Sequence, residues 1–202
     1  MAPYQVPFLF HLCSLPDSAI LTFMPLLFIL NLVCAVGGLI LLALTIVLFV
    51  DYFFNQSKYY TRFVDKFVWF IIPALTVGSV TLSLVYSEYF GFIPCSLCWL
   101  QRIALYPQAL FSLMAFKTKE SVYFPLYSIG LSIFGFIVAV YHYIYQMFPA
   151  DTSGGVMPCL ADGSADCGLK VIDLFGFVTF PFLSAVTFAF LIILYLNLRR
   201  TK

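Results

Sequence analysis

Four long stretches of this chain contain no Asp, Glu, Lys or Arg, and each is long enough to cross a lipid bilayer, which takes about 20 apolar residues. They cover residues 18–50, 67–87, 121–150 and 174–198. A fifth stretch, 98–116, is interrupted only by Arg102 near its start. The sequence therefore predicts an all-α integral membrane protein in which five helices each cross the bilayer once.

The composition indicates that lipid is the main solvent. Of the 202 residues, 63% are hydrophobic and only 9% are charged, and the mean hydropathy is +1.03. A soluble domain of this length needs far more charge to cover its surface. The net charge of +1 comes without a basic stripe, so we expect no nucleic-acid partner and a lipid bilayer as the surrounding medium.

Basic residues indicate which ends of the spans face the cytoplasm. Three basic groups fall on one side of the predicted spans, namely Lys58, Arg62 and Lys66, then Lys117 and Lys119, then Arg199, Arg200 and Lys202. The opposite loops carry five acidic residues and one basic residue, namely Glu88, Asp151, Asp162, Asp166, Asp173 and Lys170. This positive-inside pattern predicts an outer amino terminus and a cytoplasmic carboxyl terminus.

Two cysteine pairs fall on the predicted outer side, where disulfides form and persist. The first pair, Cys95 and Cys98, stands at the start of the third span, directly after Pro94. Proline suits a helix start, and the positive end of the helix dipole favours a thiolate there. Arg102 follows at spacing i+7 from Cys95, on the same helix face, so it can hold a thiolate or an oxygen of a reduced acceptor. The alternative is an arginine that only extends to the lipid headgroups.

The second pair, Cys159 and Cys167, lies in the glycine-containing outer loop 151–173. A disulfide that closes a short flexible loop is accessible to a foreign thiol, and exposed bridges tend to be more oxidising than structural ones. A dozen extended residues span about 40 Å, so this loop can reach the first pair. The two pairs together favour thiol–disulfide exchange.

The six cysteines also have less active interpretations. The outer four can form two static disulfides, or bind zinc together, although only one pair has the two-residue spacing typical of zinc ligands. We expect no metal. Cys13 and Cys34 are expected to pack as small hydrophobic side chains.

Over about residues 67–198 the chain resembles DsbB-type disulfide bond formation proteins. The resemblance lies in the run Phe92-Ile93-Pro94-Cys95-Ser96-Leu97-Cys98-Trp99-Leu100-Gln101-Arg102, followed by Tyr106-Pro107. The BdbC-like branch is the more similar, sharing Ser87-Glu88, Tyr141-His142-Tyr143, the short outer cysteine pair, Phe175-Gly176-Phe177 and Pro181-Phe182. The resemblance implies a four-helix transmembrane bundle, with the span 18–50 as one extra amino-terminal helix.

The resemblance also implies an activity, that of a thiol:quinone oxidoreductase. In this scheme Cys159 forms a mixed disulfide with a DsbA-like thioredoxin-fold thiol oxidase. Its mate Cys167 pairs transiently with Cys95, which frees Cys98 as the thiolate facing a membrane quinone, ubiquinone or menaquinone. A DsbA-type partner is already a strong oxidant, at about −120 mV, so its reoxidation needs a stronger acceptor.

Arg102 and His142 match family residues near the quinone. His142 is also the one side chain between residues 121 and 150 that can become charged near neutral pH. Ionisable residues inside a membrane are functional candidates, and a structural histidine bonded to a neighbouring helix is the alternative. Glu88, at the membrane edge, is interpreted as an interface residue.

The amino-terminal part departs from the family pattern. Residues 1–60 are expected to form an extension with one span that the catalytic scheme does not require, and residues 61–202 the catalytic domain. The extension lacks the basic start of a secretory signal, so we expect no cleavage. Met24 is an alternative start that would remove Cys13. We expect a bacterial plasma-membrane location, with the redox cysteines outside.

Two other functions fit parts of the pattern. Proteins like vitamin K epoxide reductase also couple outer cysteines to quinone, but their CxxC follows the loop cysteines, whereas here it precedes them. A membrane scaffold or transporter subunit with structural disulfides would keep its cysteines oxidised and would not need quinone.

Overall fold

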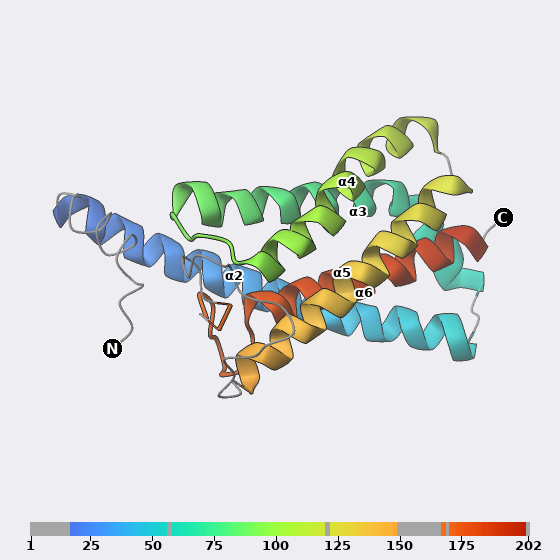
Figure 1. Cartoon of the computed structure of the whole chain (residues 1–202). Coiled ribbons are helices and arrows are strands. Elements are labelled where there is room, and N and C mark those ends of the chain that lie inside the picture. Colours follow the sequence, from blue (N-terminus) through green and yellow to red (C-terminus); the bar gives the residue numbers. More distant parts are fainter. Residues whose placement is uncertain (1–16, 56–57, 120–121, 149–166, 169, 201–202) are drawn as a thin grey trace.

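Long helices make up almost all of the structure, a computed structural model that describes residues 17–55, 58–119, 122–148, 167–168 and 170–200 (Figure 1). The helices are α2 (Asp17–Val50), α3 (Lys58–Leu84), α4 (Ser96–Thr118), α5 (Tyr123–Met147) and α6 (Phe180–Arg200). Two π-helical turns, Asp51–Asn55 and Val85–Tyr89, extend α2 and α3. Within these ranges the one β pairing is an isolated bridge between Leu174 and Val178. The predicted all-α class is confirmed.

Four of the helical segments are long and apolar enough to cross a membrane, namely Met24–Phe54, Phe67–Tyr89, Tyr123–Met147 and Phe180–Arg200. The 23-residue helix α4 is not among them. Polar residues interrupt its apolar sequence, and three of them, Arg102, Gln108 and Ser112, are buried. A helix in a bilayer can carry such residues where they face its neighbours. The chain is therefore a multi-pass membrane protein, with a bundle of α3–α6 and the additional helix α2.

Helix α6 is the most enclosed element of the bundle. Its residues Phe188, Leu191, Leu194 and Tyr195 are each no more than 1% exposed. Helices α5 and α6 approach each other closely at Gly135. The ring of Phe188 occupies the space that a larger side chain at this position would need. Small residues allow this kind of close helix packing in membranes.

Polar side chains join the helices inside the bundle. The Gln108 Oε1 atom accepts hydrogen bonds from the Ser132 hydroxyl at 3.0 Å and from the Tyr195 hydroxyl at 3.1 Å. The hydroxyls of Thr76 and Ser112 lie 2.9 Å apart. Hydrogen bonds across helices in an apolar surrounding hold α3, α4, α5 and α6 in one register.

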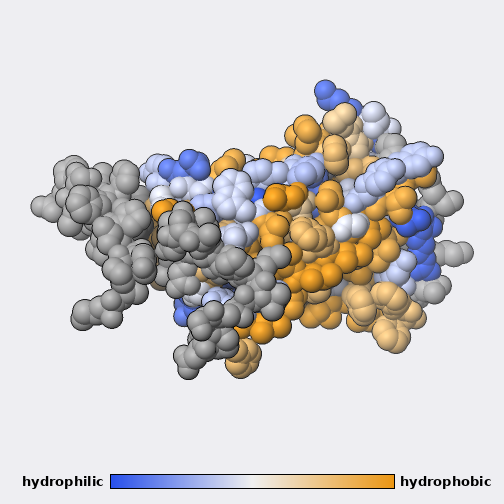
Figure 2. Space-filling model, viewed as in Figure 1, coloured by the Kyte–Doolittle hydropathy of each residue, from blue (hydrophilic) through white to orange (hydrophobic). Residues whose placement is uncertain are grey.

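Helix α2 packs along α6 and contacts the π-helical turn Val85–Tyr89 that follows α3. Leu183 of α6 lies against Gly38, and the Tyr86 hydroxyl donates a hydrogen bond to the Asn31 side chain. The other face of α2 exposes large apolar side chains, as a lipid-facing helix does. Figure 2 shows hydrophobic surface over the middle of the molecule and a strongly hydrophilic group at the end that holds the C-terminus.

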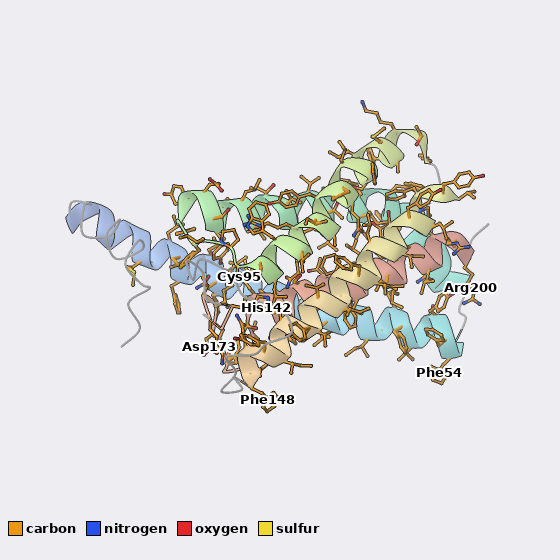
Figure 3. The ribbon with its side chains drawn as sticks, in the orientation of Figure 1. Phe54, Cys95, His142, Phe148, Asp173 and Arg200 are labelled. Carbon is orange, nitrogen blue, oxygen red and sulfur yellow. The ribbon has the colours of Figure 1, made fainter. Side chains whose placement is uncertain are left out.

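The last helix begins later than the sequence predicted. The apolar stretch 174–198 suggests a helix from residue 174, but α6 starts at Phe180. The backbone φ is 58° at Phe175 and 74° at Gly176, which a right-handed helix does not allow. These two residues form a tight turn, closed by the bridge between Leu174 and Val178. The turn precedes α6 at the same end of the bundle as the first cysteine pair (Figure 3).

Candidate functional site

The first cysteine pair stands at the start of α4. Cys95 is the N-cap residue, with an extended backbone, and its sulfur accepts a hydrogen bond from the Cys98 backbone N–H at 3.4 Å. The two sulfurs lie 2.9 Å apart, and both cysteines are free thiols. This agrees with the prediction of a CxxC at a helix start, since a sulfur at the N-cap takes one of the unpaired helix N–H groups.

His142 reaches this pair from α5. Its Nδ1 atom lies 3.2 Å from the Gln101 side-chain nitrogen, and its Nε2 atom lies 3.0 Å from the Cys167 backbone oxygen and 3.9 Å from the Cys95 sulfur. The amide N–H of Gln101 donates to Nδ1, which leaves the ring proton on Nε2. That N–H points at the Cys167 carbonyl and the Cys95 sulfur. Figure 3 shows Cys95 and His142 side by side on α4 and α5.

Cys167 joins the same cluster from the loop before α6. It is disulfide-bonded and only 1% exposed, and its sulfur lies 3.9 Å from the Ser96 hydroxyl. It packs in one buried group with Cys95 and Leu97. Cys159, its expected mate, lies outside the described residues. The structure therefore brings one cysteine of the second pair to the first pair.

The environment of Cys95 favours its thiolate. Its pKa is lowered to about 5, mainly by the hydrogen bond from the Cys98 thiol, although burial acts in the opposite direction. The nearby His142 ring and the Cys98 backbone N–H lower the pKa further. A thiol with such a pKa is ionised at neutral pH, and the thiolate is the form that attacks disulfides.

Arg102 lies one helical turn after Cys98 and is 9% exposed. Its Nε donates to the Ser83 hydroxyl and its Nη2 to the Ser83 carbonyl, each at 2.9 Å. The guanidinium carbon lies 5.2 Å from the centre of the Trp99 ring, in a cation–π contact. Arg102 therefore packs between α3 and Trp99 and does not simply extend to the headgroups.

The thiols and His142 also offer ligand atoms for a metal. Two sulfurs and a ring nitrogen, from Cys95, Cys98 and His142, lie within 4.8 Å of one another. Zinc accepts such ligands as thiolates and neutral imidazole. In this structure, however, the Nε2–H group of His142 is bonded to the Cys167 carbonyl, and Cys167 is in a disulfide. The disulfide leaves Cys167 without a free thiolate for a zinc site of four cysteines, and Cys159 lies outside the described residues.

Two residues of this cluster, Gln101 and Gln146, were not predicted from the sequence. The Gln146 side chain joins the cluster by donating a hydrogen bond to the Cys167 carbonyl at 3.2 Å. Each is a polar side chain in an otherwise apolar span, which is the signal that could have identified them. Cys34 is a free, half-buried thiol whose sulfur lies 4.0 Å from the Tyr86 hydroxyl. Glu88 is an exposed neighbour of Ser87, from which it accepts a hydrogen bond at 3.1 Å. Cys13 lies outside the described residues.

The model of one protein family, described as disulfide bond formation protein DsbB, matches residues 65–198. The chain belongs to the DsbB family. It is accordingly a membrane disulfide oxidoreductase that supports disulfide bond formation. The matched region holds both cysteine pairs, α4, α5 and most of α3 and α6, and residues 1–64 and 199–202 lie outside it.

Individual relatives agree with this assignment. The chain is 36% identical over 121 residues to disulfide bond formation protein C of Bacillus subtilis, covering 59% of this chain and 83% of the relative. It is 35% identical over 121 residues to a probable disulfide formation protein of Oceanobacillus iheyensis, covering 59% and 80%. It is 37% identical over 131 residues to a prophage-derived disulfide bond formation protein B of B. subtilis, covering 64% and 82%. No solved structure matches the chain.

Proposed function

We propose that this member of the DsbB family reoxidises a DsbA-like thioredoxin-fold thiol oxidase outside the cell membrane and passes the electron pair to a membrane quinone. The observation that supports this most is the contact of His142 with both pairs, at 3.0 Å from the Cys167 carbonyl and 3.9 Å from the Cys95 sulfur. Thiol–disulfide exchange requires the two pairs to meet, since it passes through a mixed disulfide.

The exchange begins at the second pair. A thiolate of the partner attacks the Cys159 sulfur, and Cys167 leaves as a thiolate. Cys167 then attacks Cys95 of the oxidised first pair, so a Cys95–Cys167 bond forms and Cys98 leaves as a thiolate. The second thiol of the partner displaces Cys159, which completes the partner's disulfide. Cys159 then attacks Cys167, restores the loop disulfide and frees Cys95.

After these steps the first pair is reduced and the second pair is oxidised. The structure has this distribution at Cys95, Cys98 and Cys167, since the first two are free thiols and the third is disulfide-bonded. The first pair returns to a disulfide when it gives two electrons to the quinone. A lipid-soluble quinone supplies the electron sink in this scheme.

The flank of α4 beside Cys98 suits a lipid-soluble acceptor. Trp99 and Ile103 are 50% and 58% exposed there, next to the guanidinium of Arg102. Apolar side chains would hold the ring, and the N–H groups of Arg102 would hold a carbonyl oxygen that gains charge on reduction. Two hollows of about 260 and 240 Å³ lie elsewhere, and their linings include no cysteine. We infer that the acceptor binds at this flank.

The two ends of the bundle differ in charge. Figure 3 places Cys95, His142 and Asp173 toward one end and Arg200 at the other. Toward the end of Arg200 lie the start of α3 and the ends of α4 and α6, which carry basic residues (Figure 1). By the positive-inside rule this end faces the cytoplasm. We therefore propose that the cysteines face outward, in a bacterial plasma membrane. Residues 61–202 would be the catalytic domain, and residues 1–60 an extension.

The proposal is tested with purified protein in lipid nanodiscs, a reduced DsbA-type oxidase and ubiquinone or menaquinone. Quinone absorbance should fall while the oxidase becomes oxidised, with one quinone reduced per disulfide formed. A scaffold protein with static disulfides would leave both reactants unchanged. Turnover at the wild-type rate in Cys98→Ala would remove the role proposed for Cys98.

A further inference from the structure

Two side chains of α5 bind one backbone carbonyl. His142 Nε2 lies 3.0 Å from the Cys167 oxygen, and Gln146 Nε2 donates to the same oxygen at 3.2 Å. Residues four apart lie on one face of a helix, so both donors reach the carbonyl from the same side. His142, Gln146 and Cys167 are 2%, 6% and 1% exposed. A carbonyl oxygen has two lone pairs, and here both can be used.

Gln101 on α4 fixes the donor state of His142. Its side-chain nitrogen lies 3.2 Å from Nδ1, so the ring accepts there and keeps its proton on Nε2. Gln101 and Cys95 belong to the same end of α4. The histidine therefore connects α4, which carries the first pair, to the backbone of the second pair.

The Cys167 sulfur lies close to the start of α4. That sulfur is 3.9 Å from the Ser96 hydroxyl, and Ser96 directly follows Cys95 in the chain. Cys167 and Cys95 also pack in the same buried group. Loss of either donor would leave the buried Cys167 carbonyl with one hydrogen bond instead of two and would allow the loop backbone to move away from α5.

We propose that Gln146, together with His142, is a positioning residue that holds the Cys167 carbonyl and so keeps the Cys167 sulfur within reach of Cys95. The inference rests on the proposed function only in assigning a purpose to this contact. The step that it assists is the attack of the Cys167 thiolate on Cys95, in which the Cys95–Cys167 bond forms and the Cys95–Cys98 bond breaks. Gln146 does not touch the reacting sulfurs.

The test measures how readily Cys95 and Cys167 meet, without partner or quinone. The background carries Cys98→Ser and Cys159→Ser, so that Cys95 and Cys167 are left to pair, together with Cys13→Ser and Cys34→Ser to prevent other bridges. The full chain in nanodiscs is equilibrated in glutathione redox buffers and quenched by thiol alkylation. The fraction of the protein that carries the Cys95–Cys167 disulfide is measured at each ratio of reduced to oxidised glutathione. This dependence gives the effective concentration of one thiol at the other.

In this background Gln146→Met should lower the effective concentration by about threefold to tenfold, as expected for the loss of one hydrogen bond from a pair. The matched control is Gln108→Met, the same change at an equally enclosed position of the neighbouring helix, where Gln108 is 0% exposed. Gln108 binds Ser132 and Tyr195 and does not contact Cys167, so its variant should keep the wild-type value.

Gln146→Glu keeps the length of the side chain and makes its hydrogen bond to the carbonyl depend on pH. A carboxylate cannot donate a hydrogen bond to the carbonyl, whereas the protonated acid can. The effective concentration in Gln146→Glu, divided by that in the same background with Gln146 unchanged, should therefore be low at pH 8. This ratio should approach one as the pH falls. If Gln146→Met does not fold, this pH response decides the question.

Equal effective concentrations in Gln146→Met and the parent, or a pH-independent ratio in Gln146→Glu, would overturn the proposal. An equal loss in Gln108→Met would also overturn it, because the effect would then be one of general stability. Neither outcome affects the proposed function, which is tested separately by quinone reduction.

Discussion

Arg102 of α4 holds Ser83 of α3 through two hydrogen bonds of 2.9 Å, one to the hydroxyl and one to the carbonyl. The bonds join α4, the helix that carries the first cysteine pair, to its neighbour α3. They also orient the guanidinium, because its two donors lie in one plane with fixed spacing. An oriented guanidinium can serve a quinone oxygen without first losing rotational freedom.

The first prediction concerns this orientation. Arg102→Lys should raise the apparent KM for quinone by about tenfold or more, because an ammonium group cannot reproduce the planar fork. Capture of the reduced partner should remain unchanged. The measurement is initial rate against quinone concentration in nanodiscs. Ser83→Ala keeps the charge and removes one contact, so it should have a smaller effect, and an unchanged KM in both variants would contradict the acceptor role of Arg102.

The second prediction separates the two cysteine pairs. Cys159→Ala should prevent the mixed disulfide with a reduced DsbA-type partner, since it removes the sulfur that is attacked. Cys98→Ala should still allow capture but should abolish quinone reduction. Non-reducing gels record the mixed disulfide, and absorbance records the quinone. Capture that is equal in Cys159→Ala and wild type would show that another sulfur is attacked.

The third prediction follows from the lowered pKa of Cys95, about 5 in the folded protein. Because a thiolate is lost only below its pKa, the alkylation rate of reduced Cys95 should change little around neutral pH and should fall as the pH drops through about 5. Protein unfolded in detergent should lose reactivity at the ordinary thiol pKa, about 8.5. His142→Asn should move the folded curve to higher pH. Iodoacetamide labelling read by mass spectrometry gives each curve.

The same shift has a consequence for the stability of the reduced form. The pKa of Cys95 is lower in the folded than in the unfolded state, so the folded state binds fewer protons between the two values. The stabilisation is therefore complete above about pH 8.5 and declines as the pH falls toward about 5. Unfolding of the reduced protein at several pH values, with Cys95→Ser as the control, would test the sign.

The fourth prediction concerns the packing of α5 on α6. Gly135→Ala should destabilise the fold by about 1–3 kcal/mol, because a methyl group there would overlap the buried ring of Phe188. Gly130→Ala is the matched control on the same helix, since nothing lies within 4 Å of the added carbon. Thermal unfolding in detergent compares the two. Equal melting temperatures would contradict the close contact.

The fifth prediction concerns orientation. In a variant without native cysteines, a cysteine placed at Asp173 should react with a membrane-impermeant maleimide added to intact cells. A cysteine placed at Lys119 should react only after the membrane is permeabilised. The reverse pattern would place the redox cysteines in the cytoplasm and would contradict the proposed location.

Much of the fold could be predicted from the sequence. Long uncharged stretches give the helices and their order, since backbone groups in lipid must be bonded within a helix or a closed barrel. The start of α4 followed from Pro94 and the cysteine at the helix entry. The start of α6 was predicted six residues too early. Hydropathy carries no information about backbone angles, and the positive φ angles of Phe175 and Gly176 prevent a helix there.

The residues of the candidate site could also be predicted only in part. Cys95, Cys98 and Arg102 are linked by helical spacing, so local sequence was sufficient to group them. Gln101 and Gln146 were not predicted, because their roles depend on His142 and Cys167, which come from other parts of the chain. The structure also assigned Arg102 a partner on α3, which no spacing within α4 could indicate.

Hydropathy and spacing along one helix were sufficient to predict the membrane-spanning helices, the CxxC at a helix start and the arginine one turn below it. The position of Cys167 beside Cys95, with its carbonyl bound by His142 and Gln146, became evident only in the folded structure. These residues belong to segments far apart in the sequence, such as Ser96 and Cys167 at a separation of 71 residues, so the distance between them depends on how α4 packs against α5.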